Sequence, residues 1–234
     1  MSGAPAGLSP AGFWKRYVAY SLDVTLLGVV LLPLLWLFCR HDLAQLPGQF
    51  HSLQQHLSGL IEQSSNDGQE PLGQATQMAN DPRLTSGIEQ LSDSINILML
   101  KILAIVILPA AFYFVGFEAS ARQATLGKQL IGIKVTDLRG QRISKGRALG
   151  RFLAASLSWL TMNLGHALAA WTPERRALHD YVAGTRVENA DPAQPKMPLW
   201  GWLIVAAHAL IFLLSTTAIF TMIFAAMQKM TEGM

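Results

Sequence analysis

Residues 17–38 read YVAYSLDVTLLGVVLLPLLWLF, and this stretch decides the fold. The run is apolar apart from Ser21, Asp23 and Thr25. As a helix it is roughly 33 Å long, which is enough to cross the hydrocarbon core of a bilayer. Two basic residues precede it, as in a signal peptide, but the run is longer than a signal-peptide core and no small-residue cleavage pattern follows. We therefore expect a transmembrane helix over 17–38.

Two further runs have the same character, at 95–117 and at 199–226. Only 14% of the 234 residues are charged, 51% are hydrophobic and the mean hydropathy is +0.30. Soluble domains carry about 25% charged residues. The composition and the three runs predict an all-α membrane protein with three transmembrane helices, followed by a C-terminal tail at 227–234.

The charge distribution indicates the topology. Segment 39–94 holds two basic and seven acidic residues, whereas segment 118–198 holds twelve basic and six acidic ones. Because regions rich in Lys and Arg stay on the cytoplasmic side, we expect 39–94 to be an external acidic loop. Residues 1–16 and 118–198 are then cytoplasmic, and the sequence leaves the side of the C-terminus open.

A weaker apolar segment at 147–171 lies inside the basic region and has a polar centre. On either side of it, residues 129–137 and 182–188 have the composition of short strands. Isolated strands are unstable, so these two segments pair with each other or with Arg142–Ile143. Either pairing requires both segments to lie on the same side of the membrane. We therefore favour a re-entrant or interfacial helical hairpin at 147–171 over a fourth crossing, together with a small cytoplasmic strand pair.

The external segment 39–94 has apolar residues at close to helical spacing, which predicts an amphipathic helix. These residues are Leu43, Leu46, Phe50, Leu53, Leu57, Leu60 and Ile61. A turn is expected at 66–71, and helix again from 85 into the second span. The histidines of this segment lack the spacing of metal ligands, so we interpret them as solvated and expect no metal site.

Three segments resemble the RDD family of small membrane proteins, which is named for an arginine and two aspartates. They are WKRYVAYSLD at 14–23, ATLGKQLIGIKVTD at 124–137 and LHDYVAGT at 178–185, and the RDD-like region extends over 12–188. In this resemblance Arg16 and Asp23 take the first two signature positions, and Asp180 takes the third, with Asp137 as the competitor. The acidic loop and the last span lie outside the common core.

The resemblance implies a bacterial protein, here multi-pass in the inner membrane with a cytoplasmic N-terminus. Ion transport is proposed for some members of the family and roles in membrane protein complexes for others. It therefore leaves two classes of function open for this chain, transport and accessory assembly.

Asp23 is the most informative single residue. It lies about 9 Å inside the first span, where an ionisable side chain costs a few kcal/mol or more. One hypothesis is a proton or cation site in a polar seam formed with Arg16, which Glu118 and His208 would complete. The alternative is that Asp23 neutralises a basic side chain or caps the re-entrant segment, and so fixes the fold. Pairing of Arg16 with Glu118 is compatible with antiparallel packing of the first two spans.

The remaining motifs favour no enzyme class. His179 next to Asp180 is interpreted as a hydrogen-bond lock, because no nucleophile or ligand set accompanies it. The single cysteine, Cys39, excludes a disulfide framework and a CxxC site. We therefore expect no catalytic residue and no cofactor.

A run of basic residues predicts contact with anionic lipid headgroups. It comprises Lys128, Lys134, Arg139, Arg142, Lys145, Arg147 and Arg151. The absence of interleaved aromatic residues argues against nucleic acid. The expected partners are the bilayer and either another membrane protein or a second copy of the chain. The leading hypothesis is movement of a small ion or solute along the Arg16 and Asp23 seam, and the alternative is a non-catalytic accessory or scaffold subunit.

Overall fold

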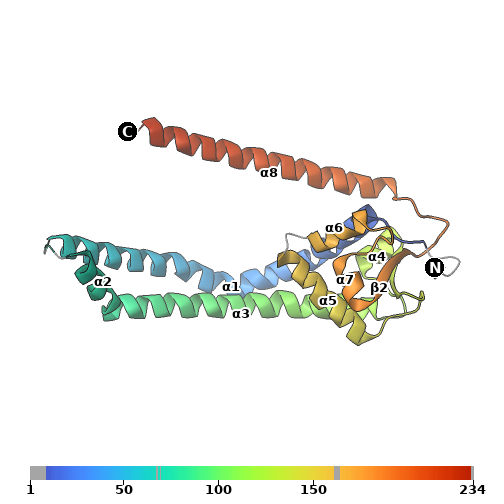
Figure 1. Cartoon of the computed structure of the whole chain (residues 1–234), viewed down its shortest axis with the longest axis horizontal. Coiled ribbons are helices and arrows are strands. Elements are labelled where there is room, and N and C mark those ends of the chain that lie inside the picture. Colours follow the sequence, from blue (N-terminus) through green and yellow to red (C-terminus); the bar gives the residue numbers. More distant parts are fainter. Residues whose placement is uncertain (1–8, 67, 69, 161–163, 233–234) are drawn as a thin grey trace. The chain divides into compact units, whose positions relative to one another are not determined.

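The structure is a computed structural model that describes residues 9–66, 68, 70–160 and 164–232 (Figure 1). Its helices are α1 (Phe13–Asn66), α2 (Pro71–Ala79), α3 (Pro82–Glu118), α4 (Leu126–Ile131), α5 (Lys145–Leu160), α6 (Leu164–Trp171), α7 (Leu178–Ala183) and α8 (Leu199–Glu232). The strands are β1 (Ile133–Asp137) and β2 (Thr185–Asn189).

Three of these helices, α1, α3 and α8, are long and apolar enough to cross a membrane, which confirms the predicted all-α membrane fold. The helices do not end where the apolar runs end. The helix of the first span continues past Phe38 to Asn66, and the helix of the second begins at Pro82. At 16 residues, α5 is shorter than the roughly 20 that a crossing needs.

Residues 27–110 form one compact unit, in which α1 and α3 pack antiparallel and α2 connects them. Polar side chains mark the register of the pair. Asp42 lies 2.7 Å from the ammonium of Lys101, Gln49 donates to Ser94 at 3.0 Å, and His56 lies 3.0 Å from the carboxylate of Asp81. His56 is therefore paired, and the interpretation of the loop histidines as solvated is wrong for this residue, because it lies in a helical pair and not in an irregular loop.

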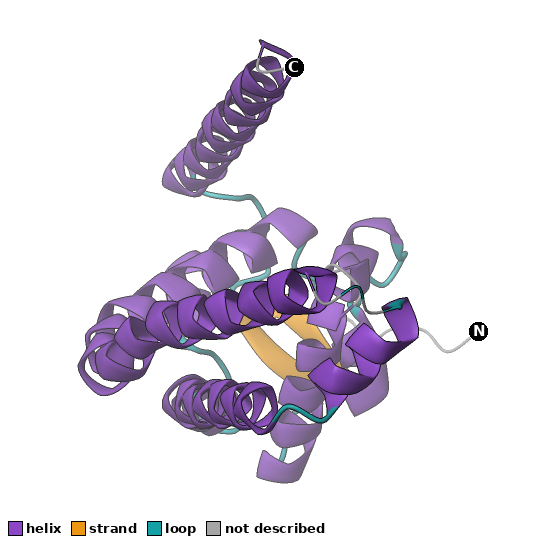
Figure 2. Ribbon diagram, turned by 90° about the vertical axis from the view of Figure 1, so that its left-hand side faces the viewer, coloured by secondary structure: helices purple, strands orange, loops and turns teal. Residues whose placement is uncertain are grey.

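The second unit comprises residues 1–26 and 111–234 and contains the sheet, which lies among helices in Figure 2. Strands β1 and β2 pair antiparallel, with Ile133 opposite Asn189 and Asp137 opposite Thr185. This confirms the predicted strand pair. The chain just before α1 extends the sheet, because the N–H of Ala11 donates to the carbonyl of Val187 at 2.9 Å. The beginning of the first span and the strand pair are thereby joined.

A buried apolar cluster holds these elements together. It combines side chains of the two strands with the first turns of α1, and its fully buried large members are Val18, Ile133, Val135, Ile143 and Val187. Burying side chains of this size stabilises a fold by about 1.5–3 kcal/mol each. The sheet is therefore packed against the start of the first span.

Residues 129–131 were predicted as strand, and this is wrong. They belong to α4, which begins after Thr125, whose side chain accepts the N–H of Lys128. The helix ends at Gly132, whose φ of 71° suits a left-handed cap. The two caps confine the helix to six residues, and the strand starts directly after it.

The segment 147–171 is divided between α5 and α6, which contact each other and α7. Residues 161–163, at the centre of the predicted hairpin, lie outside the described residues. Two short helices agree with a helical hairpin, and its position at the membrane stays a prediction.

Candidate functional site

The carboxylate of Asp23 is fully buried and accepts three hydrogen bonds. Tyr113 and Thr125 donate their hydroxyls, each at 2.6 Å, and Gly127 donates its backbone N–H at 2.7 Å. All three partners are donors, so the site is built for a carboxylate oxygen. Because Thr125 caps α4 and Gly127 lies in its first turn, Asp23 fastens the N-terminus of α4 to the first span.

The approach of α4 to α1 depends on the absence of a side chain at Gly127. A Cβ at this position would lie 2.2 Å from the carbonyl oxygen of Ala19 and 2.8 Å from Oδ1 of Asp23. Both distances are shorter than real Cβ contacts. Glycine is therefore required for the backbone to come this close.

Arg16 and Asp180 form an ion pair, with Nη1 2.5 Å from Oδ2. The Arg16 guanidinium also donates to the carbonyl of Ala11 at 3.1 Å and to that of Arg175. Oδ2 of Asp180 accepts the N–H of Ala177 at 2.9 Å, at the start of α7. The pair thus joins the first turn of α1 to a helix far along the chain.

Arg151 of α5 extends this pair into a chain of charges. Its guanidinium donates to Asp180 and, at 3.0 Å, to Glu118 at the end of α3. The other oxygen of Glu118 accepts the ammonium of Lys128 at 2.8 Å. Buried ion pairs are tolerated when each charge meets an opposite charge and its hydrogen bonds are made. The order is Arg16, Asp180, Arg151, Glu118, Lys128, and we call these five residues the charge chain.

The charge chain also reaches Asp23, because the ammonium of Lys128 lies 3.4 Å from the hydroxyl of Thr125, which donates to Asp23. With Asp23 included, three cations face three anions. The cluster is therefore electrically balanced within one chain.

The electrostatics of Asp180 agree with this balance. Burial by itself raises the pKa of a carboxyl, but the guanidinium groups of Arg151 and Arg16 outweigh burial and hold the pKa of Asp180 well below its ordinary value. Burial lowers the pKa of Arg151, yet Glu118 and Asp180 raise it above the ordinary value. Both groups are thus held in their charged forms.

The histidine next to Asp180 is held neutral. Burial, followed by the nearby charge of Arg151, lowers the pKa of His179 well below its ordinary value. Its ring packs against that of His166, with centroids 4.9 Å apart. His179 therefore fills space beside the charge chain.

The predicted site residues have other partners in the structure than the sequence suggested. Arg16 pairs with Asp180 and not with Glu118. Among the described residues, the hydrogen-bond partners of Asp23 are two hydroxyls and a backbone amide rather than a basic side chain. His208 contacts the ring of Tyr17 edge-on at 5.8 Å and is not joined to Asp23 by a hydrogen bond among the described residues.

The two candidates for the third signature position, Asp180 and Asp137, have different partners in the structure. Asp137 accepts the N–H groups of Arg139 and Gln141, each at 2.8 Å, and so serves the turn after β1. Asp180 contacts Arg16 directly.

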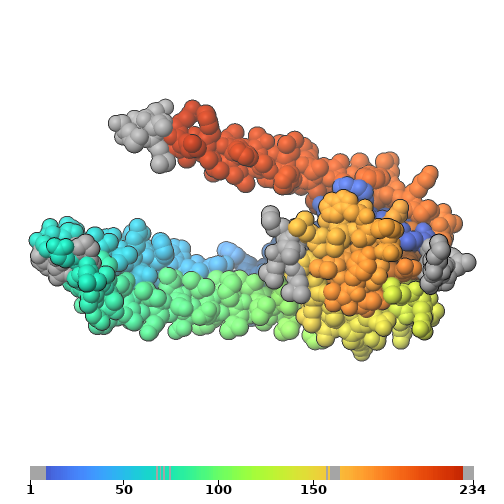
Figure 3. Space-filling model, viewed as in Figure 1, coloured from blue at the N-terminus to red at the C-terminus, as the bar shows by residue number. Residues whose placement is uncertain are grey.

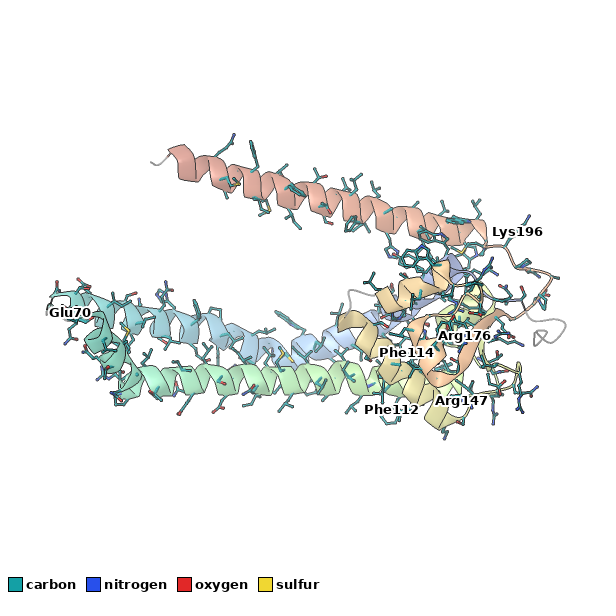
Figure 4. All side chains as sticks on the ribbon, viewed as in Figure 1. Glu70, Phe112, Phe114, Arg147, Arg176 and Lys196 are labelled. Carbon is teal, nitrogen blue, oxygen red and sulfur yellow. The ribbon has the colours of Figure 1, made fainter. Side chains whose placement is uncertain are left out.

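Two members of the basic run do not face the outside. Lys128 and Arg151 are buried in the charge chain, so their predicted contact with lipid headgroups is wrong. The others are at least partly exposed, and these are Lys134, Arg139, Arg142, Lys145 and Arg147. Figure 4 labels Arg147 on α5.

Tyr113 and Thr125, the hydroxyl partners of Asp23, were not predicted from the sequence. Thr125 stands within the segment 124–137 that carried the family resemblance, which was the available signal. Tyr113 lies in an apolar run with no feature to distinguish it.

These observations define the class as a polytopic helical membrane protein whose first span is tied to a short-helix and strand region by buried ion pairs. The chain belongs to the RDD family, which it matches over residues 10–184. It is 28% identical over 178 residues to the uncharacterized protein YxaI of Bacillus subtilis strain 168, an alignment that covers 76% of this chain and 96% of YxaI. No solved structure matches the chain. The family match leaves α8 outside.

Proposed function

We propose that this chain is a non-catalytic accessory or scaffold protein of the bacterial inner membrane, with its N-terminus and its basic region in the cytoplasm. The observation that carries this proposal is the state of Asp23. Its carboxylate is buried and already accepts three hydrogen bonds. A carrier site has to release such partners to bind and discharge its ion.

The surroundings of Asp23 support the same reading. Two open hollows on the described part of the chain are lined by residues within 70–80 and 112–122. Neither includes Asp23, Arg16 or Asp180. The charge chain, together with Asp23, is balanced without a mobile ion. Buried and fully paired charges of this kind fix one arrangement of the helices.

Transport of a small ion or solute is the competing function, and it is favoured by one observation. Charged groups beside a membrane span commonly mark ion pathways, and six lie together here. Movement of an ion along them requires the pairs between Arg16, Asp180 and Arg151 to break in turn. A static structural cluster needs no such step.

The exposed cations of the basic region suit a cytoplasmic membrane surface. Arg139, Arg142, Lys145 and Arg147 are exposed. Each basic residue near an anionic leaflet adds about 1 kcal/mol of attraction. This placement orients the charge chain toward the cytoplasmic leaflet.

The test is ion flux through the purified chain in proteoliposomes. Proton and Na⁺ fluxes are measured for the parent and for Asp23→Asn against protein-free liposomes. We expect both proteins to match the protein-free liposomes. Flux in the parent that Asp23→Asn abolishes, with the variant still folded, contradicts the scaffold proposal and supports transport.

A further inference from the structure

The helical pair of residues 27–110 has a regular seam that overlaps the start of the second apolar run and extends away from both runs. On α1 the less exposed positions recur in steps of three and four. They are Cys39, Asp42, Leu46, Gln49, Leu53, His56 and Leu60. On α3 the same steps give Leu84, Gly87, Leu91, Ser94, Leu98 and Lys101. This is the heptad spacing of two helices that pack along one stripe, with each stripe facing the other.

A second apolar stripe lies beside this seam. Leu43, Phe50 and Leu57 each follow a seam residue of α1, and Ile88 and Ile95 each follow a seam residue of α3. All five are between 37% and 61% exposed. We call these five residues the apolar flank.

The two halves of the apolar flank lie on the same side of the hairpin. In an antiparallel pair, the positions that directly follow the second seam residue of each heptad border the same edge of the seam. The opposite edge holds Gln45, Ser52, Arg83 and Gln90, and its exposed apolar residue is Ile97. Figure 3 shows the atoms of α1 and α3 of this unit packed side by side.

Helices with apolar residues at two seam positions and one flanking position are typical of bundles, whereas a two-helix seam needs only the first two. The hairpin therefore carries the pattern of a larger bundle than it forms alone. Five large apolar side chains in one strip are more than the isolated exposed residues that soluble surfaces normally show.

We propose that a second copy of this chain packs against the apolar flank, so that two hairpins form an antiparallel four-helix bundle outside the bilayer. Charge supports an identical partner. From 43 to 61, α1 contains no Asp, Glu, Lys or Arg, so two copies meet there without like charges. A strongly charged partner finds no complement on this stripe.

Anchoring in the membrane also favours a second copy of the chain as the partner. Each hairpin continues from apolar stretches at 27–38 and 95–110, so the bilayer holds two copies at one height and in one orientation. A two-fold axis along the membrane normal then brings identical stripes together at equal depth, and every helix has antiparallel neighbours. Two-fold dimers are the commonest closed assemblies. The proposal is independent of the scaffold function, because a transporter can also be dimeric.

The experiment uses the purified full-length chain in proteoliposomes, with Cys39→Ala as the background because Cys39 is the sole cysteine. Phe50→Cys is placed on the apolar flank, and Ser52→Cys on the opposite edge serves as the matched control. Both positions are exposed. A short bifunctional maleimide is added. We expect a covalent dimer for most of the Phe50→Cys protein and several-fold less for Ser52→Cys.

A second measurement guards against a labelling artefact. The paired substitution Phe50→Glu with Leu57→Glu places like charges across the interface, and Gln45→Glu with Ser52→Glu is its control. Light scattering of the detergent-solubilised protein gives the protein mass. We expect two chains of 25.6 kDa each for the parent and the control, and one chain for the flank variant. Equal cross-linking at 50 and 52, cross-linking at neither, or a monomeric parent overturns the proposal.

Discussion

The backbone N–H of Gly127 donates a hydrogen bond to the carboxylate of Asp23 at 2.7 Å, and the close approach leaves no room for a side chain. Gly127→Ala therefore forces α4 away from α1. We expect a loss of about 1–3 kcal/mol or more, the usual cost of overpacking a buried site. The measurement is the melting temperature in detergent, where about 1 kcal/mol corresponds to roughly 2–4 °C for a chain of this length.

Gly150 provides the control for this prediction. It lies in α5, and a Cβ there meets nothing within 4 Å. Gly150→Ala should leave the melting temperature unchanged or raise it slightly, because alanine favours a helix over glycine by about 0.5–1 kcal/mol. Similar losses for both variants contradict the close contact of α4 with the first span.

The order of the melting temperatures of two Asp23 variants distinguishes a structural carboxylate from a carrier site. Asparagine retains an oxygen that accepts from Tyr113 and Gly127, and the hydroxyl of Thr125 can turn to accept from its amide. Alanine leaves the hydroxyls of Tyr113 and Thr125 and the N–H of Gly127 without this acceptor, at about 1–3 kcal/mol for each buried donor. We expect Asp23→Asn to melt a few degrees below the parent and Asp23→Ala well below that. Equal melting temperatures for both variants contradict the hydrogen-bonded role of Asp23.

The pH dependence of stability should contain a contribution from His179. Its folded pKa lies below the ordinary value of 6.5 because of burial and the charge of Arg151. The unfolded chain therefore binds a proton that the folded chain does not, and stability is lost as pH falls through about 6.5, by up to about 1.4 kcal/mol per pH unit. His179→Asn should flatten the decline in melting temperature between about pH 7.5 and pH 5.5.

His41→Asn is the control for the pH experiment, because His41 is exposed on the helical pair of the other unit. This variant should keep the slope of the parent. An unchanged slope in His179→Asn shows that His179 is not held neutral in the folded protein.

The spans could be predicted from the sequence because a bilayer selects for apolar length and little else. The apolar composition of residues 17–38 and 199–226 is enough to identify both as spans. The helix ends could not be predicted in this way. Beyond Phe38 the helix is held by a seam in which apolar residues such as Leu46 alternate with polar ones such as Gln49, so polarity rises without the helix ending.

The strand pair was predictable because its two segments are strand-like stretches outside the spans, and an isolated strand is unstable. For the site, the sequence predicted the residues but not which of them pair. Arg16, Asp23, Glu118 and Asp180 were all named, yet their pairing was not. Arg16 and Asp180 are 164 positions apart, and only the tertiary packing of α1, α3, α5 and α7 decides which cation each carboxylate meets. Spacing within one helix, which suggested a seam between Arg16 and Asp23, carries no information about such partners.

The pairing of Arg16 with Asp180 connects the first span to the rest of the charge chain. A double-mutant cycle tests this pairing most directly. Melting temperatures are measured for the parent, Arg16→Ala, Asp180→Ala and the double variant, with Arg147→Ala as the control because its contact with Asp137 is exposed and 3.8 Å long. We expect each single variant to lose about 3–5 kcal/mol, as when one partner of a buried pair is removed.

The double variant should lose clearly less than the sum of the two single losses, by about 1–3 kcal/mol, and the Arg147 control should lose little. Additive losses, or single variants as stable as the Arg147 control, contradict the claim that buried ion pairs hold the first span to the rest of its unit.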